Sequence, residues 1–414
     1  MLDVHDLPYL TAEVPGIGGQ IKMRPEDFRV DEEPLYEACG DGTHVYFRIE
    51  KIGLATPRAI HDLARALHRQ PREFGYAGMK DANAVTTQII SLEHVDPKRI
   101  LELSVPRIRV LSVERHTNKL KIGHLKGNRF TIRVRDTLPE REPDVRAMLD
   151  VLGRRGVPNY FGPQRFGMRG DTWLIGRALL RGDYPEALAV LLGRCGPSDY
   201  GEVRRAREAF DRGEYEAAAD VWPYPFNTER RVCRAYAGSG NARKAFKMID
   251  AHMQRFYVSA FQSQLFNQVV SMRLDTLDRL VEGDLAWRHP QGAVFRVEDL
   301  AKEQPRCEAF EISPTGPLFG YRMSEPDGDP GRIERDLLAG ENMTLDDWRE
   351  PGQRKIKGGR RPLRFQPHES HVEGGRDEAG DYLQVQFFLE SGCYATTVLR
   401  EICKTPEVLE HFTK

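Results

Sequence analysis

The sequence predicts an α+β protein in which a mixed or antiparallel sheet with flanking helices is interrupted by a largely helical segment. Three observations lead to this prediction. In the first third of the chain, short strand-like runs are separated by single helices, a pattern typical of a sheet with helices packed on it. From about residue 175 the spacing of apolar residues becomes helical. A last strand and a helix start then follow near the end of the chain.

The predicted strands of the first third are rich in β-branched and aromatic residues and are bounded by turn signals. They cover residues 28–35, 43–53, 84–95, 107–116, 119–125 and 129–136. Two helices are expected between and after them. The first, at 57–69, has a proline at its favoured first position, and the second, at 142–156, is closed by a glycine. The late strand at 382–390 and the helix start at 393–404 have the same character.

The middle of the chain predicts helices. Three segments begin with glycine and then carry small residues at helical spacing: 182–195, 213–222 and 240–250. Their separation is near the ~34-residue period of helical-hairpin repeats, although it is irregular, so a helical scaffold is one interpretation of this region. Residues 256–277 predict another helix with an apolar face. Residues 323–365 are rich in glycine, proline and charge, and we expect an irregular domain edge there.

Composition excludes several classes of protein. The 414 residues carry 61 Lys and Arg against 62 Asp and Glu, so the total charge indicates no partner. No apolar run approaches the ~20 residues of a membrane span, and the early acids are unlike a signal peptide. The six cysteines are scattered without a CxxC pair, which argues against a zinc site and a disulfide framework. We therefore expect a cytoplasmic protein without metal, cofactor, membrane contact or obligate protein partner.

Two local clusters are basic in spite of the neutral total. Either cluster alone fits a solvated surface, but the pair, on both sides of a candidate site, favours contact with a nucleic-acid backbone, because each neutralised phosphate releases counterions. The first cluster consists of Arg115, Lys119, Lys121, Lys126 and Arg129, and the second of Arg354, Lys355, Lys357, Arg360 and Arg361. All of these except Arg115 and Arg361 are candidate contacts of the backbone.

Two further stretches have unusual chemistry. Residues 75–88, "GYAGMKDANAVTTQ", place Asp81 beside a lysine in a turn, and a turn aspartate alone would be unremarkable. Residues 157–172, "VPNYFGPQRFGMRGDT", combine aromatic rings, an asparagine and arginines in a short loop. Such a mixture suits a site that stacks a planar ring and contacts its edge, although an aromatic corner packed under a turn would be about as common.

Taken together, these stretches resemble the TruD family of tRNA pseudouridine synthases. The matching segments are "RPEDFRVDEE", "GDGTHVYFRIEKIGLAT", "YAGMKDANAVTTQ", "HLKGNRFTIRVRD", "VPNYFGPQRFG", "SAFQSQLFNQVV" and "GCYATTVLREI". The resemblance implies a pseudouridine synthase core interrupted by a TruD-type insertion domain. We expect the first part of the catalytic core at 1–184, the insertion domain at 185–366, and the strand and helix that complete the core at 367–414.

The resemblance makes Asp81 the catalytic aspartate, acting without a cofactor. A carboxylate could attack the ribose or the base as a nucleophile, or remove a proton at C2′ to start an elimination, and both routes stay open. An ionised carboxylate in a cleft closed around a base needs a nearby cation. Lys80, Lys22 and Arg400 are the three candidates for this supporting charge.

The resemblance also implies the uridine pocket and the substrate. Phe28, Asn159, Phe161 and Tyr394 are expected to line a pocket for a flipped uridine, with Tyr394 where many family members carry phenylalanine. The substrate is expected to be tRNA, modified at position 13 in the D-stem. The alternatives are a catalytically inactive RNA-binding or helical scaffold protein that keeps the fold and, with less support because no ligand cluster is present, a metal-dependent hydrolase.

Overall fold

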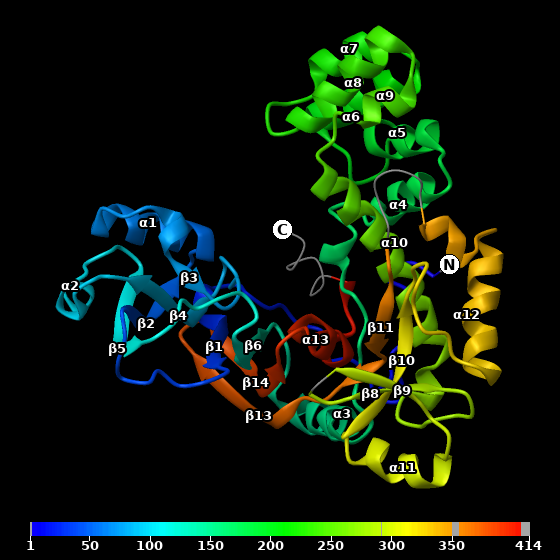
Figure 1. Ribbon diagram of the computed structural model, residues 1–414. Helices are drawn as coiled ribbons and strands as arrows, with labels where there is room; N and C mark the ends of the chain where they lie inside the picture. The colour runs from blue at the N-terminus through cyan, green and yellow to red at the C-terminus, as the bar shows by residue number, and fades with distance from the viewer. Residues whose placement is uncertain (1, 291, 350–355, 407–414) are drawn as a thin grey trace. The chain divides into compact units, whose positions relative to one another are not determined.

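The computed structural model describes residues 2–290, 292–349 and 356–406 of the chain, which form two compact units. We call residues 9–157 and 365–406 the sheet unit, and residues 2–8 and 158–364 the inserted unit. In Figure 1 the sheet unit contains the blue and cyan elements together with the orange and red strands and helix from the end of the chain. Each unit has its own sheet and its own helices.

The sheet unit is built on an eight-stranded mixed sheet (Figure 1). Across the sheet its strands are β13 (His368–Asp377), β14 (Gly380–Glu390), β6 (Leu125–Arg135), β1 (Phe28–Pro34), β4 (Val85–Glu93), β2 (His44–Ile52) and β5 (Ile108–His116), with β3 (Gly75–Tyr76) paired to β4. The pair β1 and β4 is parallel and the other neighbours are antiparallel. The predicted fold class, a mixed sheet with flanking helices, is confirmed.

Helices cover this sheet where the apolar pattern places them. They are α1 (Thr56–Leu67), α2 (Pro97–Leu101), α3 (Glu142–Arg155) and α13 (Ala395–Cys403). In α1, Ile60 and Leu63 are buried in one cluster with Phe47 of β2 and Ile90 of β4, so this helix closes one face of the sheet. The α1 helix is followed along the chain by β3 and β4. The segment between these two strands, residues 77–84, is called the Asp81 loop.

One predicted strand of this unit is wrong. Residues 119–125 were expected to be extended, but residues 117–124 form a loop and β6 begins only at Leu125. Gly123 has φ = 93°, a conformation that glycine adopts readily and that ends a strand. Its N–H donates to the carbonyl of Ala77, 2.9 Å away, and the N–H of Leu120 donates to Ser91 Oγ. These contacts fold the segment back onto the Asp81 loop.

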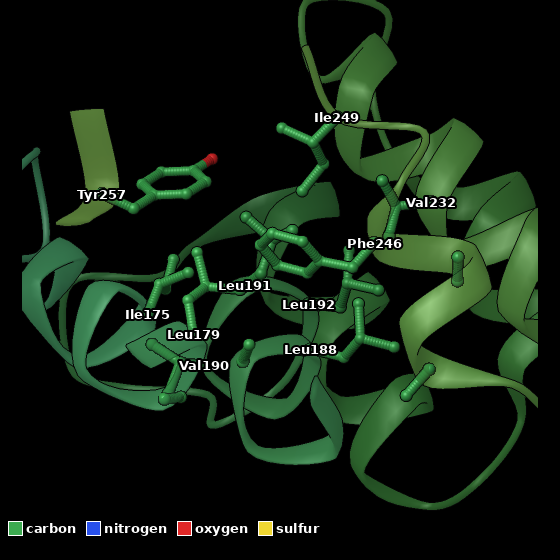
Figure 2. Close-up of a cluster of buried hydrophobic side chains, with 14 of the residues drawn as sticks. Ile175, Leu179, Leu188, Val190, Leu191, Leu192, Val232, Phe246, Ile249 and Tyr257 are labelled. Carbon is green, nitrogen blue, oxygen red and sulfur yellow. The ribbon is translucent and has the colours of Figure 1, made fainter. Parts of the chain in front are cut away.

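The inserted unit is mainly helical, as predicted for its first part. Its helices are α4 (Thr172–Leu180), α5 (Tyr184–Leu192), α6 (Gly201–Asp211), α7 (Tyr215–Val221), α8 (Asn227–Ser239), α9 (Ala242–Phe246), α10 (Ala251–Met272), α11 (Leu300–Glu308) and α12 (Gly328–Gly340). One apolar cluster joins α4, α5, α8, α9 and α10, and Figure 2 shows its centre around Leu188, Leu192 and Phe246. Residues 158–184 pack within this unit.

A second, antiparallel sheet completes the inserted unit. Its order is β11 (Gly359–Pro362), β10 (Ile312–Leu318), β8 (Leu285–Arg288) and β9 (Ala293–Arg296). The expectation of an irregular edge at 323–365 is therefore wrong, since this segment contains α12 and β11. The buried face of α12 consists of Pro330, Gly331, Glu334 and Leu338, so it lacks the apolar stripe by which a sequence reveals a helix.

The remaining short elements connect these parts. They are η1 (Pro25–Asp27), η2 (Pro71–Glu73), η3 (Pro139–Arg141), β7 (Val157–Pro158), η4 (Pro163–Arg165), η5 (Leu274–Thr276), η6 (Leu345–Trp348) and β12 (Arg364–Phe365). No helix among the described residues is long and apolar enough to cross a membrane.

An ionic cluster in the sheet unit joins three segments that are distant in sequence, η1, β6 and β13. Arg135 of β6 lies between two carboxylates: its Nη2 is 2.6 Å from Asp27 Oδ1 and 2.7 Å from Asp377 Oδ2. The backbone N–H of Arg24 also donates to Asp27, which holds η1 in place. Hydrogen bonds from the Arg135 guanidinium, together with one from the backbone N–H of Ala379, lower the pKa of Asp377 well below its ordinary value.

Replacing Arg135 with methionine should lower the free energy of unfolding by about 3 kcal/mol, because Asp27 would stay buried without its cation. Chemical denaturation followed by circular dichroism measures this change. The matched control is Arg133→Met on the same strand, whose side chain is 30 % exposed and lies 3.1 Å from Asp377. Because Asp27 keeps Arg135 in this variant, the change should cost less than about 1 kcal/mol. Equal losses in the two variants would contradict the structural role given to Arg135.

Candidate active site

The Asp81 loop is fastened to the sheet unit by a buried threonine. Thr56, at the start of α1, donates its hydroxyl to Gln88 Oε1 on β4 at 2.8 Å. The same hydroxyl accepts the backbone N–H of Lys80 at 2.9 Å. The residue before Asp81 is therefore held through its main chain.

Asp81 forms an ion pair with Lys22. The Lys22 Nζ lies 3.0 Å from Asp81 Oδ2, and the lysine side chain is 4 % exposed while that of Asp81 is 50 % exposed. The carbonyl of Lys22 accepts from the Asn83 side chain at 3.0 Å, which joins the two segments a second time. A buried ammonium thus holds a carboxylate whose other side faces solvent. Of the three predicted supporting cations, Lys22 is the one whose ammonium contacts the Asp81 carboxylate.

Phe28 lies beneath this pair. The Lys22 Nζ is 4.4 Å from the centre of the Phe28 ring, close enough for a cation–π contact. The ring is buried and meets Phe130 of β6 edge to face, with 6.2 Å between the ring centres. The contacts of Phe28 in this structure position Lys22, and through Lys22 they position Asp81.

Lys80 points away from the Asp81 carboxylate and into the sheet unit. Its Nζ lies 2.7 Å from Glu32 Oε2, and both side chains are buried. The other oxygen of Glu32 accepts the backbone N–H of Ile89 at 2.9 Å. Lys80 therefore anchors the loop to β1 and β4, and adjacency in sequence does not direct its charge to Asp81.

Arg400 and Tyr394 belong to α13 and the residue that precedes it. The Arg400 guanidinium lies over the ring of Tyr9 at 4.0 Å and 3.6 Å from Glu401. Tyr394 is half-buried, and its carbonyl accepts the Thr397 hydroxyl at 2.7 Å. The bond between Thr397 and Tyr394 lies at the start of α13, and the contacts of Arg400 lie in its last turn.

A buried lysine that sequence reasoning missed supports the Asp81 loop. The Nζ of Lys51, on β2, donates to the backbone carbonyl of Asp81 at 3.0 Å and also to the carbonyl of Leu54. Burial lowers the pKa of Lys51 to about 8, against the opposing effect of the Asp81 charge. The signal lay in the strand pattern, since Phe47, Ile49 and Lys51 alternate onto one buried face.

The aromatic–asparagine loop lies in the inserted unit, where it is also held tightly. Asn159 Nδ2 donates to the carbonyl of Pro362 at 2.8 Å, and its Oδ1 accepts from Arg361. The backbone N–H and carbonyl of Phe161 both bond to the Asn267 side chain, at 2.8 and 3.0 Å. The guanidinium of Arg361 lies 4.6 Å above the Phe161 ring. Asn159 and Phe161 are thus brought together by one arginine.

Arg361 and Asn267 were not among the predicted site residues. Arg361 was visible only as one member of a basic run, which gave no reason to separate it from its neighbours. Asn267 is a fully buried polar residue on α10, a helix predicted from its apolar face. A buried amide needs hydrogen-bond partners, and these are the main-chain groups of Phe161.

The predicted basic residues have different surroundings. In the sheet unit, Lys121 is exposed, and the exposed Lys126 lies 3.4 Å from Glu33. Arg129 contacts Glu33 at 3.0 Å and Glu369 at 2.7 Å. Lys119 is half-buried and donates to the carbonyl of Arg72.

The second basic cluster lies in the inserted unit. Lys357 is exposed. Arg360 is buried on β11 and pairs with Glu334, with 2.7 Å between Nη2 and Oε1, so its charge is directed inwards and away from a phosphate. Arg354 and Lys355 lie outside the described residues.

A half-exposed carboxylate beside a buried ammonium is an arrangement suited to nucleophilic or general-base catalysis. Comparison with known proteins also indicates an enzyme. The family model for tRNA pseudouridine synthase D (TruD) matches residues 5–402. The chain belongs to the TruD family.

The relatives match the chain over nearly its full length. A tRNA pseudouridine synthase D from Geobacter metallireducens is 48% identical over 96% of this chain and 97% of its own length. The protein of the same name from Geobacter sulfurreducens is 45% identical over 98% of both chains. The crystal structure of a TruD protein from Methanosarcina mazei superposes with a TM-score of 0.89 over 98% of both chains, at 28% identity.

Lys51 should make the stability of the protein depend on pH above about 8. In the folded chain its pKa is lowered to about 8 from an ordinary 10.5, so between these pH values the unfolded chain binds more protons. The contribution of Lys51 to stability is fully present above the unfolded-state pKa of 10.5. It is lost as the pH falls through the folded-state pKa of about 8. Relative to Lys51→Met, the wild type should gain about 1–2 kcal/mol of stability between pH 8 and about 9.5.

Urea denaturation at the two pH values measures this gain. The exposed Lys98 offers the matched control, because Lys98→Met should show the same stability difference from wild type at both pH values. If the difference between wild type and Lys51→Met stays constant with pH, Lys51 is not the buried titrating group described here.

Proposed function

We propose that this chain isomerises uridine to pseudouridine in tRNA and that Asp81 is its catalytic residue. The observation that carries the proposal is the Lys22–Asp81 pair, with 3.0 Å between Nζ and Oδ2. It supplies a carboxylate that is open to a substrate on one side and stabilised in its charged form by an ammonium on the other. Membership of the TruD family and the names of the relatives support the same reaction.

The reaction breaks the bond between C1′ of the ribose and N1 of uracil, turns the base, and joins C1′ to C5. The proton on C5 is lost and N1 gains one, so no atom or electron has to come from outside. The Asp81 carboxylate could form a transient bond to the sugar or the base, or remove the C2′ proton to start an elimination. Each route requires an ionised carboxylate in a fixed place. Lys22 provides the charge, and Thr56 and Lys51 provide the position.

We retain Phe28 and Tyr394 of the sheet unit, and Asn159 and Phe161 of the inserted unit, as the proposed uridine-binding residues. Aromatic faces stack on a flipped base and offset the cost of unstacking it. The Asn159 amide uses one N–H on Pro362 and one acceptor position on Arg361, so a second N–H and a second lone pair match a uracil edge. Arg361 is the positioning residue for both Asn159 and Phe161, because it contacts both.

The RNA backbone is proposed to contact the basic residues Lys119, Lys121, Lys126, Arg129, Lys357, Arg354 and Lys355. We leave out Arg360 because its guanidinium is paired inside the inserted unit. We retain residues 1–184 and 367–414 as the catalytic core and residues 185–366 as the insertion domain, and we retain position 13 of the D-stem as the target and the cytoplasm as the location. A catalytically inactive RNA-binding protein gains no support, because Asp81 and its cation are both present.

Replacing Asp81 with asparagine should abolish pseudouridine formation in tRNA and leave the tRNA dissociation constant nearly unchanged. The amide keeps the size of the side chain but supplies neither a nucleophilic nor a basic oxygen. Pseudouridine mapping of a tRNA transcript and a filter-binding assay measure the two quantities. Glu102→Gln, an exposed carboxylate of the sheet unit, is the control and should behave as wild type. Full activity in purified Asp81→Asn would overturn the assignment.

Replacing Lys22 with methionine should lower the single-turnover rate by about 100-fold, because Asp81 loses the ammonium that holds its carboxylate in place. Binding of tRNA should change little, since Lys22 is buried. Lys121→Met, which removes an exposed lysine of the same unit, should leave the single-turnover rate at saturating tRNA unchanged. A wild-type rate in Lys22→Met would show that Lys22 does not position Asp81 for the reaction.

A further inference from the structure

The inserted unit contains a cavity that the proposed reaction does not use. Its volume is about 540 Å³, within the range of pockets that bind small molecules. It lies among the loop before α4, the segment that leads into α6, the start of α8 and the first half of α10. All of its lining residues belong to the inserted unit, so the cavity is complete within that unit.

The walls of the cavity are apolar and rigidly supported. Ile175, Val190, Leu191 and Tyr257 line it and are also members of the main apolar cluster of the unit (Figure 2). Their side chains are buried, so the shape of the cavity is set by a packed core. A pre-formed cavity binds without the cost of ordering its own walls.

The lining offers flat and polarizable surfaces to a planar ring. Phe226 and Phe256 line the cavity together with the thioether of Met253. At its edge, Met168 and Tyr200 are each 77% exposed, which is unusual for side chains of this size. Aromatic rings and thioethers favour contact with the face of another ring, so the walls suit a heteroaromatic base better than an aliphatic chain.

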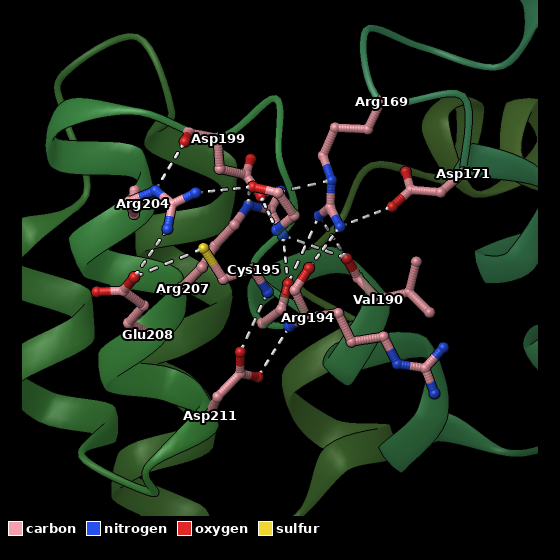
Figure 3. Close-up of polar contacts among 12 residues, drawn as sticks. Arg169, Asp171, Val190, Arg194, Cys195, Asp199, Arg204, Arg207, Glu208 and Asp211 are labelled. Carbon is pink, nitrogen blue, oxygen red and sulfur yellow. Dashed lines mark hydrogen bonds and ion pairs between the residues drawn. The ribbon is translucent and has the colours of Figure 1, made fainter.

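The charged floor of the cavity is already neutralised by its own residues (Figure 3). Arg207 Nε lies 3.2 Å from Asp199, and Arg169 Nη2 lies 3.0 Å from Asp171. Both guanidinium groups also donate to the carbonyls that end α5, for example Arg207 to Gly193 at 2.7 Å. Because these positive charges are matched by two carboxylates and by main-chain oxygens, the floor does not favour a phosphate group.

Glu229, in the first turn of α8, adds a further acid to the cavity lining. Burial raises its pKa, in spite of a hydrogen bond from its own backbone N–H and of the Arg207 charge. The neighbouring Tyr257 hydroxyl has its pKa raised to about 12, by burial first and then by the charge of Glu229. The raised pKa indicates that the hydrogen bonds and charges around the Glu229 carboxylate only partly replace the water that it loses on burial. A ligand with two adjacent N–H donors would replace it.

We propose that this cavity binds a guanine base, with the ring against the aromatic and thioether walls and its N1–H and N2–H groups on the Glu229 carboxylate. Among the four RNA bases, only guanine presents two adjacent donors on that edge to an acceptor-only group. The base belongs either to an unpaired nucleotide of the RNA substrate or to a free guanine nucleoside. The first source rests on the function proposed above, and the second does not.

Titration of the full chain with nucleosides, followed by calorimetry, tests the ligand class. Guanosine should bind, inosine should bind about fivefold more weakly because it lacks the N2 amine, and adenosine and uridine should bind more weakly still. In Glu229→Gln the affinity for guanosine should fall about tenfold. Met253→Trp, which fills the cavity from a partly exposed position, should abolish binding. The control Glu216→Gln, an exposed glutamate of α7, should bind guanosine as wild type does.

Affinity for a tRNA transcript, measured for the same three variants, separates the two sources. If Glu229→Gln and Met253→Trp weaken tRNA binding and Glu216→Gln does not, the guanine is part of the RNA. If they weaken guanosine binding alone, the ligand is a free nucleoside. Thermal unfolding of each variant verifies that the unit is folded.

Two results would overturn the inference: adenosine binding as tightly as guanosine, or no guanosine binding at millimolar concentration together with unchanged tRNA affinity in both cavity variants. Neither result bears on Asp81. Activity retained in Asp81→Asn, in turn, would remove the proposed function without changing the guanosine titration.

Discussion

Three buried ammonium groups beneath one loop are the constraint on which the rest of the sheet unit depends. Lys22 meets the Asp81 carboxylate, Lys51 meets the Asp81 carbonyl, and Lys80 meets Glu32. An ammonium inside a protein is stable only if acceptors replace its hydration. Each lysine therefore requires its oxygen partner at a fixed place, and the loop that supplies two of these oxygens is fixed as a consequence. The half-exposed side of Asp81 is what this arrangement leaves open to a substrate.

In the inserted unit, buried or half-buried arginines hold separate segments together. Arg361 holds Asn159 and Phe161, Arg360 is paired with Glu334, and Arg207 closes the end of α5. A guanidinium has five N–H groups in one plane and can bind several acceptors at once, which suits it to joining segments that are distant in sequence. The arginines of this part of the chain thus serve its internal structure as well as its surface.

Much of the fold was predictable because its elements have regular patterns. The strands around β2 and β4 alternate, α1 has an apolar face, and the segments 75–88 and 157–167 are specific enough to predict the family. The sequence could not show which cation meets Asp81, because Lys22 is fifty-nine positions away and only the folded sheet brings it near. It also concealed α12, whose buried face contains proline, glycine and glutamate. Long-range pairing and polar burial leave no periodic signal.

The strand order of the sheet unit has a consequence for the order in which the chain can fold during synthesis. Its strands β13 and β14 are translated last, yet β14 pairs along the length of β6 and β13 pairs with β14. The edge of β6 that pairs with β14 therefore stays unpaired until the whole inserted unit has left the ribosome. The inserted unit has its own apolar core. Domains fold as they emerge, and pairing of segments distant in sequence is slow. The inserted unit can reach its native state first, and a nascent chain that stops before residue 380 would expose β6 as an unpaired edge open to association with other chains.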